Sequence, residues 1–323
     1  MTYKIMLTDS IYPDTSIEMA ELEAIGARIV RPKGIDAASL LETGHDCDGI
    51  LCDYASIDKT VIAGLGKCKV IAEAGIGVNN IDLEAAAAKG IKVANVPHYC
   101  LREVADHAMA LFLACARKLL PYDRDIRAGK WDKLEHAPIY RLAGQNFCLF
   151  GFGAIARKVA ARARAFEMQV HAFDPFLPDE AFAAEGVSRV SSLEKLARIA
   201  DVFSIHAPLT DDTRGIVGRD VFSTMKAGCI VLNTSRGGLV AEQDLVDALA
   251  AGKIAAAGLD VLQSEPPKPD SPLLRMNNVV LTPHCGFFSN ESDEELRRTM
   301  AREVVRTLTG GEPLSWVNRK YFS

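Results

Sequence analysis

Three turns in the second half of the chain each carry one side chain that could take part in a reaction. Arg236 follows Asn233-Thr234-Ser235, Glu265 precedes two prolines, and His284 follows Thr282-Pro283. An arginine can hold a carboxylate through two hydrogen bonds, and a histidine can donate a proton near neutral pH. If Glu265 is hydrogen-bonded to His284, it favours the protonated imidazole. The three side chains together predict a site that binds a carboxylate and exchanges a proton with a group beside it.

Each of these side chains also has a plainer interpretation. Arg236 could cap a helix, Glu265 could be a solvated loop acid, and His284 could be hydrogen-bonded within its own loop. All three turns follow expected strands, however, and open parallel sheets bind ligands beyond the carboxyl ends of their strands. The set therefore favours chemistry over three independent structural roles.

A glycine turn lies between an apolar run, residues 147–150, and a run typical of a helix. In this Gly-x-Gly-x-x-Ala motif Gly151 would allow the turn, Gly153 would let the backbone approach a pyrophosphate, and Ala156 would let helix and strand pack closely. The helix N-terminus would donate N–H groups to the phosphates. Asp174 follows the next apolar run and could bind a ribose hydroxyl. A plain turn is the alternative, but strand, helix and acid in register favour a dinucleotide site. Together with Arg236, Glu265 and His284, such a site predicts hydride transfer between a 2-oxo acid and NADH.

A second glycine turn, Gly75-Ile76-Gly77-Val78-Asn79, also lies between a strand pattern and a helix pattern. The position about 20 residues further on is Asn95, so no acid is available for a ribose hydroxyl. It is either a structural turn or a cradle whose backbone N–H groups bind a small anion such as a carboxylate. The chemistry of the three turns favours the cradle.

Strand and helix patterns alternate in two separate series, which predicts parallel sheets with helices on both faces. The first series has strands at residues 5–7, 27–30, 49–52, 70–72 and 91–94, and the second has strands at 147–150, 170–173, 202–205, 229–233, 255–259 and 279–281. A last helix, residues 294–309, could cross back to the first series. We therefore predict an α/β protein with two doubly wound parallel-sheet domains. They are a flavodoxin-like substrate-binding domain of residues 1–98 and 289–323, and a Rossmann NAD-binding domain of residues 99–288.

Apolar residues recur at helical spacing from Leu101, and Pro121 is expected to end this helix. His107 lies within it and is expected to be a packed or interface residue. The next segment, residues 122–142, is polar and has no clear period. It is either a solvated linker or an arm that packs on a second subunit, and Trp131 favours the arm.

The composition is that of an ordinary globular protein, with 323 residues, a net charge of −5 and 49% hydrophobic residues. Neither a basic block nor an apolar run of transmembrane length is found, which argues against nucleic acid and membranes as partners. The N-terminus has no signal-peptide pattern. The eight cysteines are scattered singly, which predicts a cytoplasmic protein with reduced cysteines and no metal site.

These motifs resemble those of the D-isomer-specific 2-hydroxyacid dehydrogenases along nearly the whole chain. The matching segments are residues 75–82, 95–97, 103–108, 151–156, 233–240, 258–261, 265–266 and 282–284. The resemblance implies that Arg236 binds substrate and that Glu265 and His284 form the acid–base pair. It also implies that Asp174 selects NAD over NADP and that Asp260 contacts the nicotinamide carboxamide.

The resemblance further implies a homodimer joined through the NAD-binding domain and a substrate carboxylate bound by the turn at residues 75–79. The residues expected to contact NAD or NADH are Gly151, Phe152, Gly153, Ala154, Ile155, Asp174, His206, Ala207, Pro208, Thr213, Thr234, Ser235, Arg236, Asp260 and His284. The residues expected to contact the small acid are Tyr54, Ile76, Gly77, Val78, Arg236, His284 and Phe287.

Within the family, the chain is most similar to the branch of the C-terminal-binding-protein corepressors and their bacterial dehydrogenase relatives. Phe287 lies where the corepressors carry a tryptophan, whereas Asn79 and His98-Tyr99 depart from the usual pattern. Three functions compete: reduction of a small 2-oxo acid such as glyoxylate or hydroxypyruvate, NAD(H) sensing with vestigial catalysis, and dehydrogenation of another substrate class. The intact set of Arg236, Glu265 and His284 favours the first. A loop at residues 53–56 without Arg or Lys disfavours a phosphorylated substrate.

Overall fold

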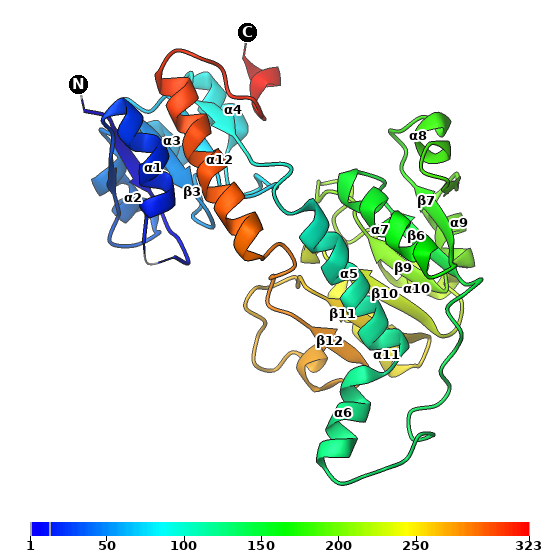
Figure 1. The fold of residues 1–323 in the computed structure, drawn as a ribbon. Helices are drawn as coiled ribbons and strands as arrows, with labels where there is room; N and C mark the ends of the chain where they lie inside the picture. Colours follow the sequence, from blue (N-terminus) through cyan, green and yellow to red (C-terminus); the bar gives the residue numbers. More distant parts are fainter. Residues whose placement is uncertain (1, 13, 323) are drawn as a thin grey trace. The chain divides into compact units, whose positions relative to one another are not determined.

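The computed structural model of the chain describes residues 2–12 and 14–322 and divides into two compact units (Figure 1). The first unit comprises Met1–Cys100 and Ser289–Ser323, and the second comprises Leu101–Phe288. Each unit is built around its own parallel sheet, which confirms the predicted pair of α/β folds.

The first unit holds a five-stranded sheet with the order β2-β1-β3-β4-β5, which is the order of flavodoxin-like folds. Strands β3 and β4 are buried at every position because helices cover both faces of the sheet. The strands are β1 Lys4–Leu7, β2 Arg28–Val30, β3 Gly49–Cys52, β4 Val70–Glu73 and β5 Lys92–Ala94. The helices are α1 Ser16–Leu22, η1 Glu23–Ile25, α2 Ala37–Gly44, α3 Lys59–Gly64, α4 Leu83–Ala88, α12 Asn290–Leu308 and η4 Arg319–Tyr321.

Helix α12 belongs to the first unit although it follows the second unit in sequence. It begins at Asn290 rather than at the predicted residue 294, because Ser289 and Ser292 form a capping box before it. Arg297 on this helix is buried and donates to both carboxylate oxygens of Glu18 on α1, at 2.7 and 2.8 Å. Removing one partner of such a buried pair costs about 3–5 kcal/mol, so this pair fixes the helix on its unit.

The second unit holds a seven-stranded sheet with the order β12-β11-β10-β9-β6-β7-β8. From β6 the strand order continues through β7 and β8 on one side and through β9 to β12 on the other, as in the Rossmann fold. The point where the strand order reverses therefore lies between β6 and β9. The strands are β6 Asn146–Phe150, β7 Gln169–Phe173, β8 Ser188–Arg189, β9 Val202–Ile205, β10 Cys229–Asn233, β11 Ile254–Leu259 and β12 Val279–Leu281. The helices are α5 Leu101–Ala116, α6 Leu119–Arg127, α7 Ala154–Ala165, α8 Asp179–Ala183, α9 Leu193–Ile199, α10 Arg219–Thr224, η2 Gly237–Leu239, α11 Glu242–Ala250 and η3 Pro272–Arg275.

The predicted helix end at Pro121 was wrong. Helix α5 ends at Ala116, and Lys118 adopts a left-handed backbone with φ 55° before α6 begins. Pro121 lies in the first turn of α6, where a missing N–H costs no intrahelical hydrogen bond. The residues after Pro121 are therefore helical as far as Arg127, and only the remainder of the predicted polar segment is irregular.

Candidate active site

The glycine turn after β6 brings two stretches of backbone close together. Gly151 has φ 88°, and a Cβ there would lie 2.7 Å from backbone atoms of His206 and Ala207. Only glycine fits both this conformation and this contact. A Cβ at Gly153, in contrast, would meet nothing within 4 Å, and α7 begins at the next residue. The turn therefore leaves open space beside a helix N-terminus, where phosphate groups bind readily.

Asp174, directly after β7, ties the turn to the neighbouring strand. Its Oδ2 accepts a hydrogen bond from the N–H of Phe152 at 3.0 Å, and its Oδ1 accepts one from the N–H of Phe176 at 3.0 Å. A carboxylate oxygen can accept two hydrogen bonds. Asp174 can therefore hold the turn and still accept a hydrogen bond from a ribose hydroxyl.

The loop after β9 closes the other side of the turn. The backbone N–H of His206 donates to Phe150 O at 2.7 Å, and its Nε2 lies 2.8 Å from Ser204 Oγ. Burial lowers the pKa of His206 to about 4, so its ring is neutral at physiological pH. Thr213 donates its hydroxyl to Pro208 O at 2.7 Å and holds the loop closed.

The hydroxyl of Thr234, after β10, is buried and has no hydrogen-bond partner among residues 2–12 and 14–322. Buried polar groups without partners are rare in folded proteins, so this one is available to a ligand. The next residue, Ser235, donates its hydroxyl to Ile205 O at 3.0 Å and links β10 to β9. The free hydroxyl of Thr234, the open space at Gly153 and the start of α7 together fit a bound dinucleotide.

The structure brings the predicted acid–base pair into contact. Arg236, Glu265 and His284 follow β10, β11 and β12, three neighbouring strands of the sheet. His284 Nδ1 lies 2.7 Å from Glu265 Oε2, and Glu265 Oε1 accepts a hydrogen bond from Leu262 N–H at 2.9 Å. Burial raises the pKa of Glu265, but the hydrogen bonds from His284 and Leu262 and the nearby charge of Arg236 outweigh it and leave the pKa below its usual value. Glu265 is therefore an ionised acceptor that orients the imidazole.

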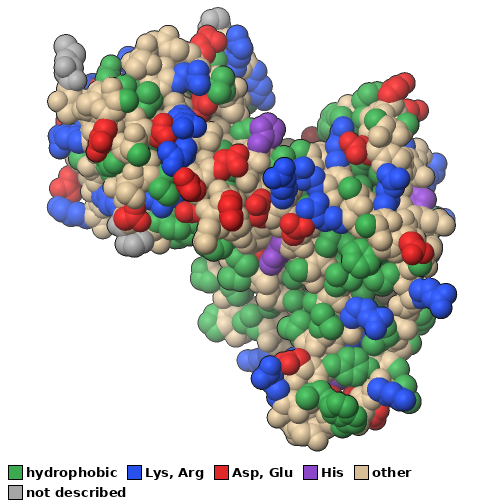
Figure 2. All heavy atoms as spheres, in the orientation of Figure 1, with side chains coloured by type: hydrophobic (Ala, Val, Ile, Leu, Met, Phe, Trp, Pro, Cys, Tyr) green, Lys and Arg blue, Asp and Glu red, His purple; other side chains and the backbone are tan. Residues whose placement is uncertain are grey.

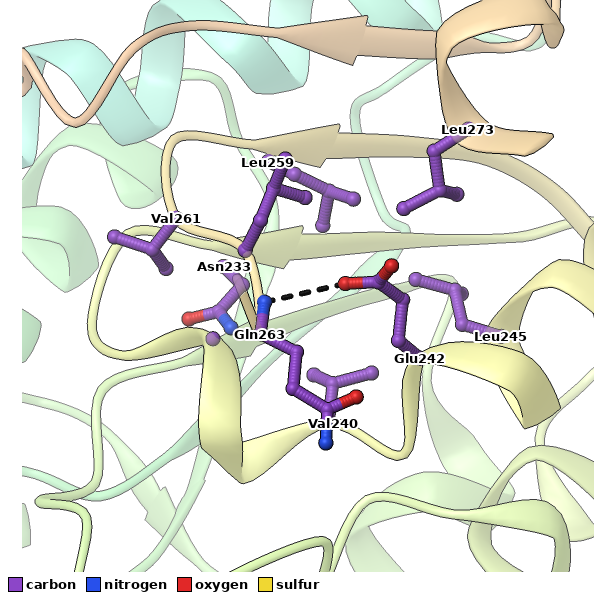
Figure 3. A pocket seen from close by; sticks show the side chains of 10 residues that line it. Asn233, Val240, Glu242, Leu245, Leu259, Val261, Gln263 and Leu273 are labelled. Atoms are coloured by element: carbon purple, nitrogen blue, oxygen red, sulfur yellow. Dashed lines mark hydrogen bonds between the residues drawn. The ribbon is translucent and has the colours of Figure 1, made fainter. Parts of the chain in front are cut away.

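A close contact between two loops holds Arg236 near this pair. A Cβ at Gly237 would lie 1.9 Å from the backbone of Leu262, so no side chain fits at that position. Glu242 Oε2 accepts a hydrogen bond from Gln263 N–H at 3.1 Å and anchors the same loop to α11 (Figure 3). The hollow shown there is lined mainly by leucine and valine side chains, several of them from these two loops. This packing sets the spacing between the arginine and the acid.

The carboxylate of Asp260 is engaged within the chain. It is 3% exposed, and it accepts hydrogen bonds from Thr282 Oγ1 at 2.6 Å and from the N–H groups of Cys285 and Gly286 at 3.0 and 2.9 Å. Burial raises its pKa, but these donors and His107 outweigh burial and lower the pKa of Asp260 to about 2. The implied contact with the nicotinamide remains a prediction, whereas this network gave no signal in the sequence.

In the first unit, the turn after β4 presents backbone donors. In the part of the chain that the structure describes, the N–H groups of Ile76, Gly77 and Val78 donate to no protein acceptor. Asn95 Nδ2 donates to Ile76 O at 2.7 Å and fixes the turn from behind. Three successive free N–H groups could bind an anion, and the cradle interpretation of this turn stays a prediction.

The two remaining predicted substrate contacts lie in different units. Tyr54 follows β3 in the first unit, is 56% exposed, and donates its N–H to Asp9 Oδ2 at 2.7 Å. Phe287 lies at the end of the second unit and packs edge to face with Phe288, with ring centroids 6.4 Å apart. Their predicted contacts with substrate remain predictions.

Residues 109–286 match the family described as "D-isomer specific 2-hydroxyacid dehydrogenase, NAD binding domain". The chain is 38% identical over 308 residues to the D-3-phosphoglycerate dehydrogenase of Methanocaldococcus jannaschii, covering 95% of this chain and 58% of that protein. It is 40% identical over 242 residues to the hydroxypyruvate reductase of Thermotoga maritima, covering 74% and 78%. The crystal structure of a glyoxylate reductase from Paecilomyes thermophila is 28% identical, covers 99% of both chains and has a TM-score of 0.89.

The chain belongs to the D-isomer-specific 2-hydroxyacid dehydrogenase family. The family match lies in the NAD-binding domain, and the residues around Gly151 fit that cofactor, so NAD(H) is the cofactor of this site. The chain spans just over half the length of the phosphoglycerate dehydrogenase that it matches. Over residues 2–12 and 14–322, helices long and apolar enough to cross a bilayer are not found.

Proposed function

We propose that the protein is an NAD-dependent oxidoreductase that interconverts a small 2-oxo acid and its D-2-hydroxy acid. Glyoxylate and hydroxypyruvate are the candidate substrates. The observation that carries the proposal is the 2.7 Å contact between His284 Nδ1 and Glu265 Oε2, with Arg236 at the end of the next strand. Family membership and the hydroxypyruvate and glyoxylate reductases among the relatives support it.

In this reaction Arg236 would bind the substrate carboxylate through two hydrogen bonds and polarise the carbonyl oxygen. NADH, when bound, supplies the hydride that adds to the carbonyl carbon. His284 Nδ1–H donates a hydrogen bond to Glu265 and keeps its proton, so the Nε2 proton of the imidazolium is the one given to the developing alkoxide. In the oxidation of the hydroxy acid, the neutral Nε2 takes this proton back.

The turn at Ile76, Gly77 and Val78 is the proposed second binding element for the substrate carboxylate. Its free N–H groups suit an anion, and they need no side-chain charge. The substrate-binding role of the first unit, residues 1–98 and 289–323, rests on this turn. The NAD-binding role of residues 99–288 rests on the glycine turn at Gly151.

A substrate without a phosphate group fits the first unit best. Asp9 and Asp53 lie at the carboxyl ends of β1 and β3, and β3 is the neighbour of β4, which the turn follows. Negative groups repel a doubly charged phosphate. This distinguishes the proposal from phosphohydroxypyruvate reduction, the reverse of the reaction in the name of the archaeal relative.

Substitution of the proposed catalytic residues tests the function. His284→Ala and Arg236→Ala should each lower kcat/KM for reduction of hydroxypyruvate by roughly 10²- to 10⁴-fold, because each removes a group that acts in the transition state. NADH binding, followed by fluorescence titration, should persist in both variants. His171→Gln is the matched control, since His171 bonds Asn146 Oδ1 at 3.0 Å, away from these residues. Wild-type activity in both variants would sink the proposal.

The alternative function is that of an NAD(H)-sensing binding protein similar to the corepressors. A protein that binds NADH tightly but reduces no 2-oxo acid would be an NAD(H) sensor with vestigial catalysis. Turnover of a substrate that lacks a carboxylate would instead indicate another substrate class. Robust turnover of any small 2-oxo acid favours the reductase.

We also propose that the protein is a homodimer formed through residues 122–142. Hydrophobic side chains gather on the face of the second unit that carries α5 and α6 (Figure 2). In this segment Trp131 is 90% exposed, Leu134 69% and Tyr140 66%. Large aromatic side chains this exposed are typical of protein interfaces. Sedimentation should give a dimer for the wild type and a shift toward monomer for Trp131→Ser with Leu134→Ser. A wild-type monomer at micromolar concentration would contradict the arm.

A further inference from the structure

His107, on α5, lies beside the loop that carries His284, although the proposed reaction does not use it. Its Nε2 lies 2.8 Å from Thr282 Oγ1 and 3.4 Å from Asp260 Oδ1. The single hydroxyl proton of Thr282 points to the ionised Asp260, 2.6 Å away, because a carboxylate can only accept. Thr282 must therefore accept from His107, which fixes a proton on His107 Nε2.

One residue, Asp260, holds three successive backbone N–H groups after β12. Its carbonyl oxygen accepts from His284 at 2.8 Å, and its carboxylate accepts from Cys285 and Gly286 at 3.0 and 2.9 Å. Hydrogen bonds from N–H groups to a charged acceptor are stronger than neutral ones. The path of the chain through these residues is therefore set by Asp260.

His284 needs such a hold because its backbone is left-handed, with φ 53°. This conformation is unfavourable for a non-glycine residue and persists only where the surroundings fix it. The same backbone presents the imidazole Nδ1 to Glu265 Oε2 at 2.7 Å. The loop conformation and the acid–base contact are thus coupled.

The space around His107 leaves no room for the loop to shift. A Cβ at Gly286 would lie 2.8 Å from Asp260 Oδ2 and 3.2 Å from His107 Cδ2. The imidazole ring of His107 therefore holds the loop in place by packing against Gly286 as well as by its hydrogen bond to Thr282. Loss of the ring would free both constraints at once.

The same residues have the composition of a metal site, since ligand atoms of His107, Asp260 and Cys285 lie within 4.8 Å of one another. Hydrogen bonds already engage His107 Nε2 and both oxygens of Asp260. Burial and the nearby Asp260 raise the pKa of Cys285, which disfavours the thiolate that a metal needs. Hydrogen bonding within the chain accounts for this cluster without an ion.

We propose that His107 is a positioning residue for His284. Through Thr282 and Asp260 it holds the left-handed loop in the conformation that keeps the imidazole against Glu265. This inference rests on the proposed reduction of a 2-oxo acid, because only there does the placement of His284 affect a rate.

The test compares His107→Leu, which cannot donate, with His107→Gln, which can donate to Thr282 through its amide. His107→Leu should lower kcat for hydroxypyruvate roughly 10- to 100-fold, while the Kd for NADH changes by about twofold or less. His107→Gln should recover most of this loss. His171→Leu, which loses a hydrogen bond elsewhere in the same unit, should leave kcat unchanged.

The pH profile separates positioning from mere loss of folded protein. Among residues 2–12 and 14–322, the charged and titratable groups near His284 or its loop include the Glu265 carboxylate, the Arg236 guanidinium, the Asp260 carboxylate, the Cys285 thiol and the His107 imidazole itself. When the loop loosens, the imidazolium loses the contact with Glu265, so the high-pH limb of kcat for reduction should move to lower pH. Loss of folded protein would scale kcat equally at every pH.

Hydrogen exchange of residues 282–288 gives a readout that needs no turnover. It should be faster in His107→Leu than in the wild type and should be restored in His107→Gln. Unchanged exchange and an unchanged pH limb in His107→Leu would overturn the inference. If the wild type reduced none of the acids, the proposed function would fail, and the exchange result would still decide whether His107 holds the loop.

Discussion

Two buried carboxyl groups lie at matching places in the two sheets and differ in charge. Glu73 is the last residue of β4 in the first unit, and Asp260 directly follows β11 in the second. Their exposed fractions are nearly equal, 4% and 3%. Nevertheless the pKa of Glu73 is raised to about 8, whereas the pKa of Asp260 is lowered to about 2.

The difference comes from the donors around each group. Burial penalises the ionised form of both, but Asp260 accepts from a hydroxyl and two backbone N–H groups. Glu73 accepts from Asn80 Nδ2 at 3.2 Å, and the nearby charges of Asp53 and Asp9 raise its pKa further. Near pH 7 the second unit therefore holds a fixed negative charge beside the loop that carries His284, while the first unit holds a neutral acid beside its glycine turn.

Of the substitutions at these two sites, Asp260→Asn should change the free energy of unfolding the most. The amide N–H₂ of asparagine would face one of the backbone N–H groups that now donate to the carboxylate. Because two donors would then face each other, the substitution should lower the free energy of unfolding by about 2–4 kcal/mol at pH 7. The folded-state pKa is depressed, so the wild-type contribution is present above pH ~4 and is lost as the pH falls toward 2. Urea unfolding at pH 7 and pH 3 measures this, and the difference between variant and wild type should shrink at pH 3. A variant as stable as the wild type at pH 7 contradicts the donor network.

Glu73→Gln should stabilise the protein at high pH, whereas Asp260→Asn should destabilise it. The folded-state pKa is raised, so the stability that the protonated acid contributes is complete below pH ~4.5 and is lost as the pH rises through about 8. The neutral glutamine should change stability little at pH 5 and increase it by about 1–3 kcal/mol at pH 9. Thermal unfolding at the two pH values measures this. Glu84→Gln, an exposed control in the same unit, should change stability equally at the two pH values. If Glu73→Gln also changed stability equally at both pH values, Glu73 would be ionised throughout.

Asn80→Ala should have the smallest effect. It removes the donor to Glu73 and the hydrogen bonds from Asn80 to the carbonyls of Asp53 and Ala55, at 3.0 and 3.1 Å. We expect a loss of about 1 kcal/mol at pH 7 and a coupling of about 0.5–1 kcal/mol with Glu73→Gln. A double-mutant cycle by chemical unfolding measures both. Strict additivity would show that Asn80 does not influence the charge of Glu73.

The architecture could be predicted from the sequence because periodicity and glycine turns are local signals. Alternating strand and helix patterns predicted both parallel sheets, and the apolar pattern near the C-terminus predicted helix α12, which belongs to the first unit. The position of Pro121 was misleading because a proline in the first turn of a helix and a proline after its end look alike in one sequence. Short elements such as β8 and α8 gave no period long enough to recognise.

The candidate site could be predicted only where a motif and a strand end coincide. Arg236, Glu265 and His284 were found in this way, and the structure places the latter two in contact. His107 was expected to be a packed or interface residue of a long helix, and its link to Thr282 spans 175 positions, which no local pattern reveals. The charge states of Glu73 and Asp260 depend on burial and on hydrogen bonds that form only in the folded chain, so they were equally hidden.

Transfer of deuterium tests the central claim most directly. NADH carrying deuterium at the transferable position of the nicotinamide would be incubated with the protein and hydroxypyruvate, and the product would be resolved on a chiral column and examined by mass spectrometry. The expected product is D-glycerate with deuterium at C2, formed by the wild type and lost in His284→Ala. Product of the L configuration, product without deuterium, or equal product from His284→Ala would contradict it.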